Sequence, residues 1–193
     1  MTGGGLDPFG CAMFLVTAFA IAGCAQATWL GSAASRRYGW PIDGGLSFRG
    51  RRLLGANKTV RGFLVMPLAT GVAFFLMAMA TAGRVPGLWS LRPHEYAALG
   101  LLAGVGFMAG ELPNSFVKRQ LDIAPGAAAN GPFRRPAFFL VDRLDSAIGA
   151  LAALALAVSI PPLTILYVLT VGPVLHGMFS VMTFRLGGKE RAA

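Results

Sequence analysis

Long apolar runs separated by short polar segments set the pattern along this chain. A helix that crosses the hydrocarbon core of a membrane needs roughly 20 residues, and five runs reach that length. They lie at about residues 9–35, 60–82, 96–116, 137–158 and 161–184. We therefore predict an all-α integral membrane protein with five transmembrane helices, in which residues 1–193 form a single membrane-embedded domain.

Composition agrees with this prediction. Hydrophobic residues make up 55% of the chain and charged residues only 13%, whereas a soluble domain usually carries about a quarter charged residues. Because the five runs take up over half of the sequence, no separate soluble domain fits beside them.

Positive charge is concentrated in the segments on one side of the predicted membrane. Residues 36–61 carry seven Lys or Arg, residues 117–136 carry four and the C-terminal tail carries three, against two on the other side. Since cytoplasmic loops are enriched in Lys and Arg, we predict cytoplasmic loops at 36–59 and 117–136, a cytoplasmic C-terminus and an N-terminus outside. The Ala, Gly and Arg content suggests a GC-rich genome, and hence a bacterial cytoplasmic (inner) membrane.

Three acidic residues lie within or at the ends of the apolar runs. Asp142 and Asp145 open the fourth run, in "FFLVDRLDSAIGAL", and Glu111 ends the third. Ionisable groups in such places are costly and are functional by default. The i, i+3 spacing puts Asp142 and Asp145 on one helix face, which Ser146 and Gly149 continue.

A polar stripe marks the end of the third run, "MAGELPNSFVKR". Glu111, Ser115 and Lys118 follow one another at helical spacing, and Pro113 favours a kink. A kinked and polar helix end at membrane depth is typical of a wet cavity or a binding site. Two Gly-x-x-x-Gly spacings upstream favour close helix packing, at Gly100/Gly104 and Gly106/Gly110.

The paired aspartates allow two interpretations. Carboxylates without His or Cys nearby suit Mg²⁺ or Mn²⁺ rather than Zn²⁺, so they predict a metal site at the cytoplasmic end of the fourth helix. Alternatively, Asp142, Arg143 and Asp145 form a salt-bridge cluster that joins helices.

The first basic loop, "PIDGGLSFRGRRLLGANKTVRGF", combines glycines with cations. It does not match the P-loop motif, because Ala56 and Asn57 interrupt the spacing and no βαβ unit precedes it. Its chemistry still suits phosphate: glycines expose backbone N–H groups, and Lys58 and Thr59 lie near the start of a helix, where anions are favoured. We therefore interpret it as a phosphate-binding loop.

Three segments together carry a family resemblance. "DGG…FRGRRLLGANKTVRG", "GELPNSFVKRQLDIAPG" and "FFLVDRLDSAIGAL" resemble the CDP-archaeol synthases, which are five-span relatives of phosphatidate cytidylyltransferase. The resemblance implies an enzyme that transfers CMP from CTP to a lipid phosphate, releases pyrophosphate and requires Mg²⁺. The family usually carries Asp at the position of Glu111, so this chain keeps the charge on a longer arm.

The motifs and the resemblance together assign residues to three roles. The predicted metal ligands are Asp142, Asp145 and Glu111. The predicted catalytic residues are Asp142, Asp145 and Lys118. The predicted nucleotide- and phosphate-binding residues are Asp43, Arg51, Arg52, Gly55, Asn57, Lys58, Thr59, Arg61, Ser115, Arg119 and Arg143.

The expected partners are CTP, a lipid phosphate and membrane lipids, and a homodimer stays open. Nucleic acid is not expected, because the positive charge lies on membrane-adjacent loops. A small transporter and a non-catalytic scaffold with a basic cytoplasmic face are the alternatives to an enzyme. A CDP-alcohol phosphatidyltransferase is disfavoured because its D-G-x-x-A-R…G-x-x-x-D-x-x-x-D pattern is absent. The sequence leaves open whether the lipid is a diacyl or a diether compound.

Overall fold

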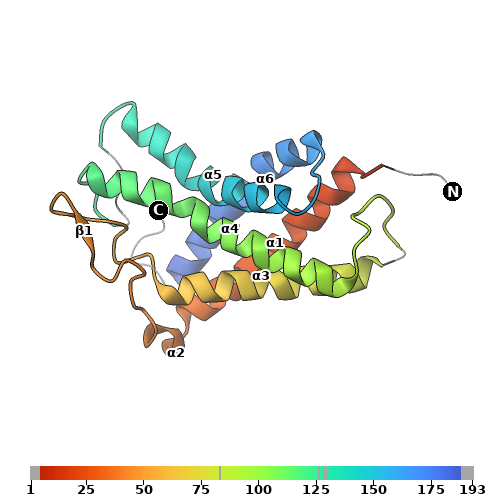
Figure 1. Ribbon diagram of the computed structural model, residues 1–193. Helices are drawn as coiled ribbons and strands as arrows, with labels where there is room; N and C mark the ends of the chain where they lie inside the picture. Colours follow the sequence, from red (N-terminus) through yellow and green to blue (C-terminus); the bar gives the residue numbers. More distant parts are fainter. Residues whose placement is uncertain (1–4, 83, 126, 128–129, 188–193) are drawn as a thin grey trace.

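Five long helices form a closed ring in the computed structural model, which describes residues 5–82, 84–125, 127 and 130–187. Each long helix packs on the next in the order α1, α3, α4, α5, α6 and back to α1 (Figure 1). The long helices are α1 (Pro8–Gly31), α3 (Val60–Thr81), α4 (Pro93–Gln120), α5 (Arg134–Ala155) and α6 (Pro162–Arg185). The short elements are α2 (Ala33–Arg36) and an antiparallel pair of strands, β1 (Ser47–Phe48) and β2 (Arg51–Arg52).

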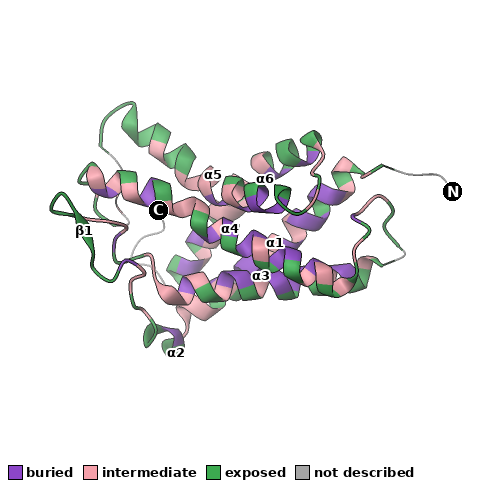
Figure 2. Ribbon diagram, viewed as in Figure 1, coloured by how far each residue is buried: buried purple, intermediate pink, exposed green. Residues whose placement is uncertain are grey.

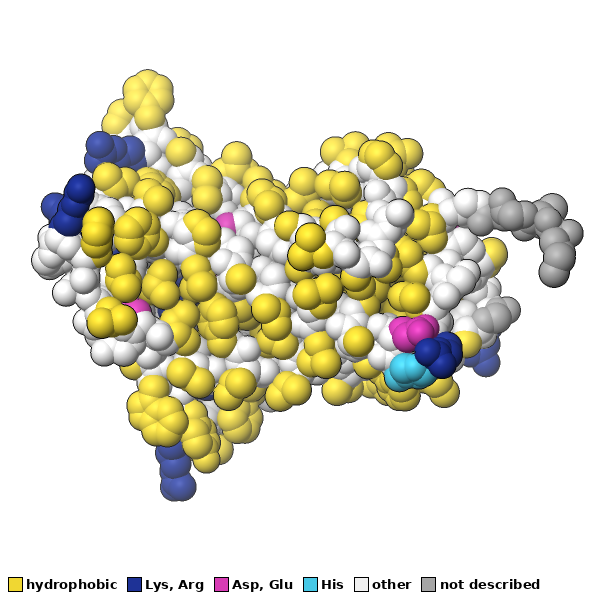
Figure 3. All heavy atoms as spheres, in the orientation of Figure 1, with side chains coloured by type: hydrophobic (Ala, Val, Ile, Leu, Met, Phe, Trp, Pro, Cys, Tyr) yellow, Lys and Arg dark blue, Asp and Glu magenta, His cyan; other side chains and the backbone are white. Residues whose placement is uncertain are grey.

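The five helices run between the same two ends of the molecule. At one end, Asp7 N–H donates to Gly87 O at 2.8 Å, and Trp89 Nε1 donates to Ser159 O at 2.8 Å. These bonds join the start of α1 to the α3–α4 turn, and that turn to the α5–α6 turn. The opposite end holds α2, the strands and the α4–α5 loop, and we call it the basic end. Side chains of Lys and Arg gather there in Figure 3.

Most predicted helices are confirmed, with two corrections to their bounds. The predicted span 9–35 is interrupted at Ser32, whose backbone is extended and whose side chain caps α2 by accepting from Ser35 N–H. The predicted span 96–116 stopped too early, because α4 continues through Pro113 to Gln120. The polar stripe therefore belongs to the helix itself, and the following loop begins after residue 120.

Within the described residues, four helices are long and apolar enough to cross a membrane: α1, α3, α4 and α6. The remaining long helix, α5, carries five charged side chains among its first twelve residues. Its 22 residues give a length of about 33 Å, which matches a hydrocarbon core of about 30 Å. The fifth crossing and the orientation of the bundle stay predictions. Lys189 and Arg191, which contributed to the charge asymmetry, lie outside the described residues.

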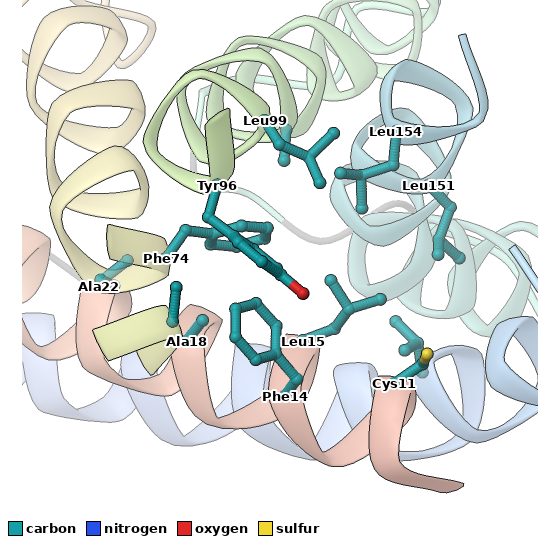
Figure 4. Close-up of a cluster of buried hydrophobic side chains, with 14 of the residues drawn as sticks. Cys11, Phe14, Leu15, Ala18, Ala22, Phe74, Tyr96, Leu99, Leu151 and Leu154 are labelled. Carbon is teal, nitrogen blue, oxygen red and sulfur yellow. The ribbon is translucent and has the colours of Figure 1, made fainter. Parts of the chain in front are cut away.

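An aromatic and aliphatic core fills the inside of the ring (Figure 4). Phe14 and Phe74 meet edge to face with ring centroids 5.3 Å apart, and the Tyr96 hydroxyl donates to Trp89 O at 2.7 Å. Leu15 and Leu154 are fully buried beside them. The outer faces of the helices are largely exposed (Figure 2) and apolar, as expected of surfaces that contact lipid.

Glycines on α4 bring its backbone against two neighbours. Gly104 packs on α3, where an added Cβ would lie 3.0 Å from Pro67 N. Gly106 and Gly110 pack on α5, where a Cβ on Gly110 would lie 2.9 Å from Gly149 Cα. The predicted close packing is confirmed. Its consequence is that polar side chains one turn further along α4 reach directly across to α5.

Candidate active site

An asparagine joins the two aspartates at the α4–α5 contact. Asn114 Nδ2 donates to Asp142 Oδ1 at 2.6 Å and to Asp145 Oδ2 at 2.9 Å. Both carboxylates therefore face α4 from the same side of α5, as their spacing predicted. Asn114 is not among the site residues predicted from the sequence. Its signal was available, because residues 111, 114 and 118 share a helix face.

The network continues from the aspartates to Glu111. Ser146 Oγ donates to Glu111 Oε1 at 2.9 Å, and Ser146 N–H donates to Asp145 Oδ1 at 2.7 Å. Ser146 is 1% exposed, so its hydroxyl joins the two carboxylates away from solvent. The three acidic residues predicted as metal ligands thus belong to one polar cluster between α4 and α5.

Two lysines pair with two of the three carboxylates of this cluster. Lys118 forms an ion pair with Asp142 on α5, and Lys58 forms one with Glu111 on α4. Arg143 instead lies against the Phe139 ring, with its Cζ 4.1 Å from the ring centroid. The salt-bridge cluster Asp142–Arg143–Asp145 considered from the sequence is therefore the wrong pairing, since the helix turns Arg143 away from the face that the aspartates share.

The first basic loop is organised around Asp43. Its carboxylate accepts from the N–H groups of Gly45, Leu54 and Gly55, each at 3.1 Å, and from Arg52 Nη2 at 3.0 Å. Burial would raise the pKa of Asp43, but these donors outweigh it and lower the pKa to about 2. The side chain of Asp43 is fully buried. Its carboxylate therefore holds the loop in shape, and any effect on a nucleotide is indirect.

A basic pocket lies where this loop meets the C-terminal end of α4. It has a volume of about 260 Å³ and is lined by Gly50, Arg51, Arg52, Arg119, Asp122, Ile123, Ala124 and Pro125. Arg51 pairs with Asp122 and Arg52 with Asp43. Arg119 is 8% exposed, and its Nε and Nη1 have no hydrogen-bond partner among the described residues. Buried donors of this kind suit an anion.

The remaining predicted phosphate-binding residues are not part of the lining of this pocket. Gly55 has φ +97°, and a Cβ there would lie 3.5 Å from Arg119 Cδ and 3.2 Å from Asn57 Oδ1. Thr59 is the N-cap residue of α3, without a side-chain hydrogen bond to the helix. Arg61 turns toward α2, where its Nη1 donates to Ser35 Oγ at 3.0 Å. Ser115 is buried on α4.

Mg²⁺ prefers oxygen ligands, and the cluster between α4 and α5 supplies them. Among the described residues, no group of three or more His, Cys, Asp or Glu side chains could hold a metal ion by itself. Mg²⁺ is commonly held by one or two carboxylates together with substrate phosphates. Asp142 and Asp145 supply such a pair, and Asn114 Oδ1 beside them is buried without a hydrogen-bond partner. The residues fit a cation that takes its remaining ligands from a nucleotide.

Comparisons with known proteins show the family to which the chain belongs. A family model described as "CarS-like: CDP-archaeol synthase" matches residues 12–192. The chain belongs to the CDP-archaeol synthase family. The CDP-archaeol synthase of Methanospirillum hungatei is 36% identical over 163 residues, which cover 79% of this chain and 89% of that protein. The CDP-archaeol synthase of Halobacterium salinarum is 38% identical, and the match covers 79% of this chain and 82% of that protein.

A solved structure supports both the fold and the family. It is described as "Structural insight into an intramembrane enzyme for archaeal membrane lipids biosynthesis", and it matches with a TM-score of 0.59 and 30% sequence identity. The match covers 86% of this chain and 89% of that one. As a member of the CDP-archaeol synthase family, the chain is an integral membrane enzyme of the cytidylyltransferase class. The relatives named here are archaeal, so the bacterial inner membrane stays a prediction.

Proposed function

We propose that this enzyme transfers CMP from CTP to the phosphate of a membrane glycerolipid precursor, yielding a CDP-lipid and pyrophosphate, with Mg²⁺ and at the cytoplasmic face. The observation that carries the proposal is the cluster of Asp142, Asp145 and Asn114 beside a basic pocket, at one end of a bundle of apolar helices. Family membership favours this enzyme over a transporter or a scaffold.

The bond changes need no activated side chain. An oxygen of the lipid phosphate attacks the α-phosphorus of CTP, a new P–O bond forms, and the bond from the α-phosphorus to the bridging oxygen of the β-phosphate breaks. Pyrophosphate leaves with that electron pair. Because the attacking oxygen is already anionic, the main obstacle is repulsion between two anions, and electrostatic stabilisation is the main remedy.

The cations of the site are placed to reduce that repulsion. Lys58 and Lys118 pair with Glu111 and Asp142, and nucleotide phosphates would compete for these lysines. Arg119 offers buried donors to the part of the triphosphate that enters the basic pocket. Asp142 and Asp145 would hold Mg²⁺, which when bound supplies charge neutralisation to the α-phosphate and the leaving pyrophosphate.

The lipid would reach the site from the side. The exposed surfaces of the helices are apolar along their length, while charged side chains gather at the ends (Figure 3). The tails of a lipid phosphate would stay in the bilayer while its headgroup meets the cluster at the basic end. Diether and diacyl glycerophosphates both fit this geometry.

The proposal is tested with purified protein, labelled CTP, Mg²⁺ and a panel of diacyl and diether lipid phosphates. We expect label in a lipid product with at least one member of the panel, and none with Asp142→Asn. Failure of every lipid phosphate to accept label would overturn the proposed function.

A further inference from the structure

We propose that Asn114 is a positioning residue that sets the separation of Asp142 and Asp145 and completes, with its side-chain oxygen, the set of oxygens that receives the divalent cation. This inference rests on the proposed function, because it concerns the same metal-dependent site. It assigns a role to Asn114, which is not itself one of the acidic residues of the site.

The two hydrogen bonds of Asn114 come from a single amide nitrogen. Nδ2 donates one bond to Asp142 at 2.6 Å and one to Asp145 at 2.9 Å. Two carboxylates at i and i+3 repel each other when both are ionised. An amide that uses both of its N–H groups to hold one oxygen of each fixes the gap between them without adding charge.

The orientation of the amide follows from this arrangement. If the amide were flipped, Oδ1 would face two carboxylate oxygens with no proton between them, which is repulsive, so the assigned orientation is the one the neighbours select. Oδ1 must then point away from the aspartate oxygens that Nδ2 holds. It is buried and has no hydrogen-bond partner among the described residues.

A buried acceptor without a partner calls for an explanation in a membrane enzyme. Asn114 is 8% exposed, so bulk water does not satisfy its oxygen freely. An amide oxygen is a hard ligand of the kind that Mg²⁺ and Mn²⁺ accept. Together with the remaining lone pairs of Asp142 and Asp145, whose carboxylates also accept from Lys118 and Ser146, it adds an oxygen from α4 to the carboxylate oxygens of α5.

Side chains that orient metal ligands typically change metal affinity by about 10- to 100-fold when they are removed. A residue that only joined α4 to α5 would instead change stability and leave the affinity of the folded protein intact. Metal affinity therefore separates the two roles, and it is measured without turnover.

The test measures Mn²⁺ binding to the purified full-length protein in detergent, from the electron paramagnetic resonance signal of free Mn²⁺, without lipid. We expect Asn114→Ala to weaken Mn²⁺ binding at least tenfold. The matched control is Gln26→Leu, which removes a partly buried amide on α1 whose Nε2 contacts Met108 Sδ at 3.7 Å. We expect it to bind Mn²⁺ within twofold of the wild type. Binding by folded Asn114→Ala within twofold of the wild type would overturn the inference.

A second variant carries the test if Asn114→Ala does not fold. Asn114→Gln keeps the amide but lengthens its arm by one methylene, which displaces both the N–H donors and the oxygen, so we expect Mn²⁺ binding to weaken at least tenfold. Binding by folded Asn114→Gln within twofold of the wild type would overturn the inference. If the wild type binds Mn²⁺ but transfers no CMP to any lipid phosphate, the proposed function fails while the binding comparison still decides the inference.

Discussion

Gly110 on α4 and Gly149 on α5 lie backbone against backbone, so that a Cβ added to Gly149 would lie only 2.7 Å from Gly110 Cα. This contact sets the distance between the two helices at the level of the polar cluster. One turn further along α4, Asn114 donates hydrogen bonds to Asp142 and Asp145 on α5. The chemistry of the site therefore depends on two residues that carry no side chain.

Gly149→Ala should push α5 away from α4. Overpacking of this kind costs roughly 1–3 kcal/mol of stability. Because it also displaces the two aspartates, the enzyme should lose most of its CMP-transfer activity. The measurements are the thermal unfolding midpoint and the rate of CMP transfer. Gly172→Ala on α6 is the matched control, because its added Cβ would meet only Ala147 Cβ at an ordinary 3.5 Å. Equal effects of the two variants would show that the close contact does not position the site.

Asp142→Asn and Asp145→Asn should each abolish CMP transfer while the protein stays in the membrane. Both carboxylates accept from the same amide, and each is expected to contribute to one cation. The check is turnover measured over a range of Mg²⁺ concentrations. Near-normal turnover at limiting Mg²⁺ in either variant would remove that aspartate from the metal site.

Lys58→Ala should weaken the use of CTP more than the use of lipid. Losing a charge-assisted contact costs roughly 1.5–3 kcal/mol, which corresponds to about 10- to 150-fold. The readout is the apparent affinity for CTP and for the lipid, measured separately. Arg49→Ala is the matched control in the same loop, since Arg49 is exposed and lies 5.2 Å from the Phe48 ring centroid. We expect it to stay within twofold of the wild type.

The ion pair of Lys58 with Glu111 adds a second arm to that experiment. If Lys58 served only to neutralise Glu111, adding Glu111→Gln to Lys58→Ala would restore the affinity for CTP. We expect no restoration, because the lysine is assigned to the phosphates. Recovery in the double variant would assign Lys58 a purely structural role.

Low pH should destabilise the first basic loop, because it protonates the Asp43 carboxylate. Its pKa of about 2 lies below the usual value of 3.8, so its contribution to stability is present above pH 4 and is lost as pH falls toward 2. Hydrogen exchange of residues 44–55 should therefore rise between pH 4 and pH 2, after correction for the intrinsic rates. In Asp43→Asn the loop should already exchange faster at neutral pH. Wild-type protection in that variant would contradict the role of Asp43 in the loop.

Thiol labelling tests whether α5 crosses the membrane as the fifth transmembrane helix. Ser47, Ser90 and Ser159 are all exposed, with Ser47 at the basic end and the other two in the turns at the opposite end. In intact cells, cysteines at Ser90 and Ser159 should react with an impermeant reagent, whereas one at Ser47 should be shielded. A shielded Ser159 beside a reactive Ser90 would show that α5 does not cross the membrane.

Helix existence and the acidic residues were predictable from the sequence because burial in a membrane makes apolar runs long and charges rare. The helix bounds were less predictable. Pro113 favoured a kink in the third helix and the apolar run ended at residue 116, yet α4 continues to Gln120. The partners of the charges were not predictable either. Lys58 and Glu111 are 53 positions apart, and only the folded ring brings them together.

For Asn114, the sequence shows the helix face that it shares with Glu111 and Lys118, but it does not show which side chains the amide contacts. An asparagine next to a proline in a polar stripe is usual at a helix end, and nothing local indicates that its amide reaches two aspartates of another helix. The glycines that make this reach feasible were identified as packing residues, but the sequence did not show which helix each would contact. Gly104 contacts α3 and Gly110 contacts α5.

The most direct test of the central claim follows the fate of each phosphate of CTP. With CTP labelled in the α-phosphate, the account predicts label in the lipid product; with CTP labelled in the γ-phosphate, it predicts label in pyrophosphate and none in the lipid. One pyrophosphate should form for each CDP-lipid. Transfer of the γ-label to the lipid, or pyrophosphate release without labelled lipid, would contradict cytidylyl transfer by this enzyme.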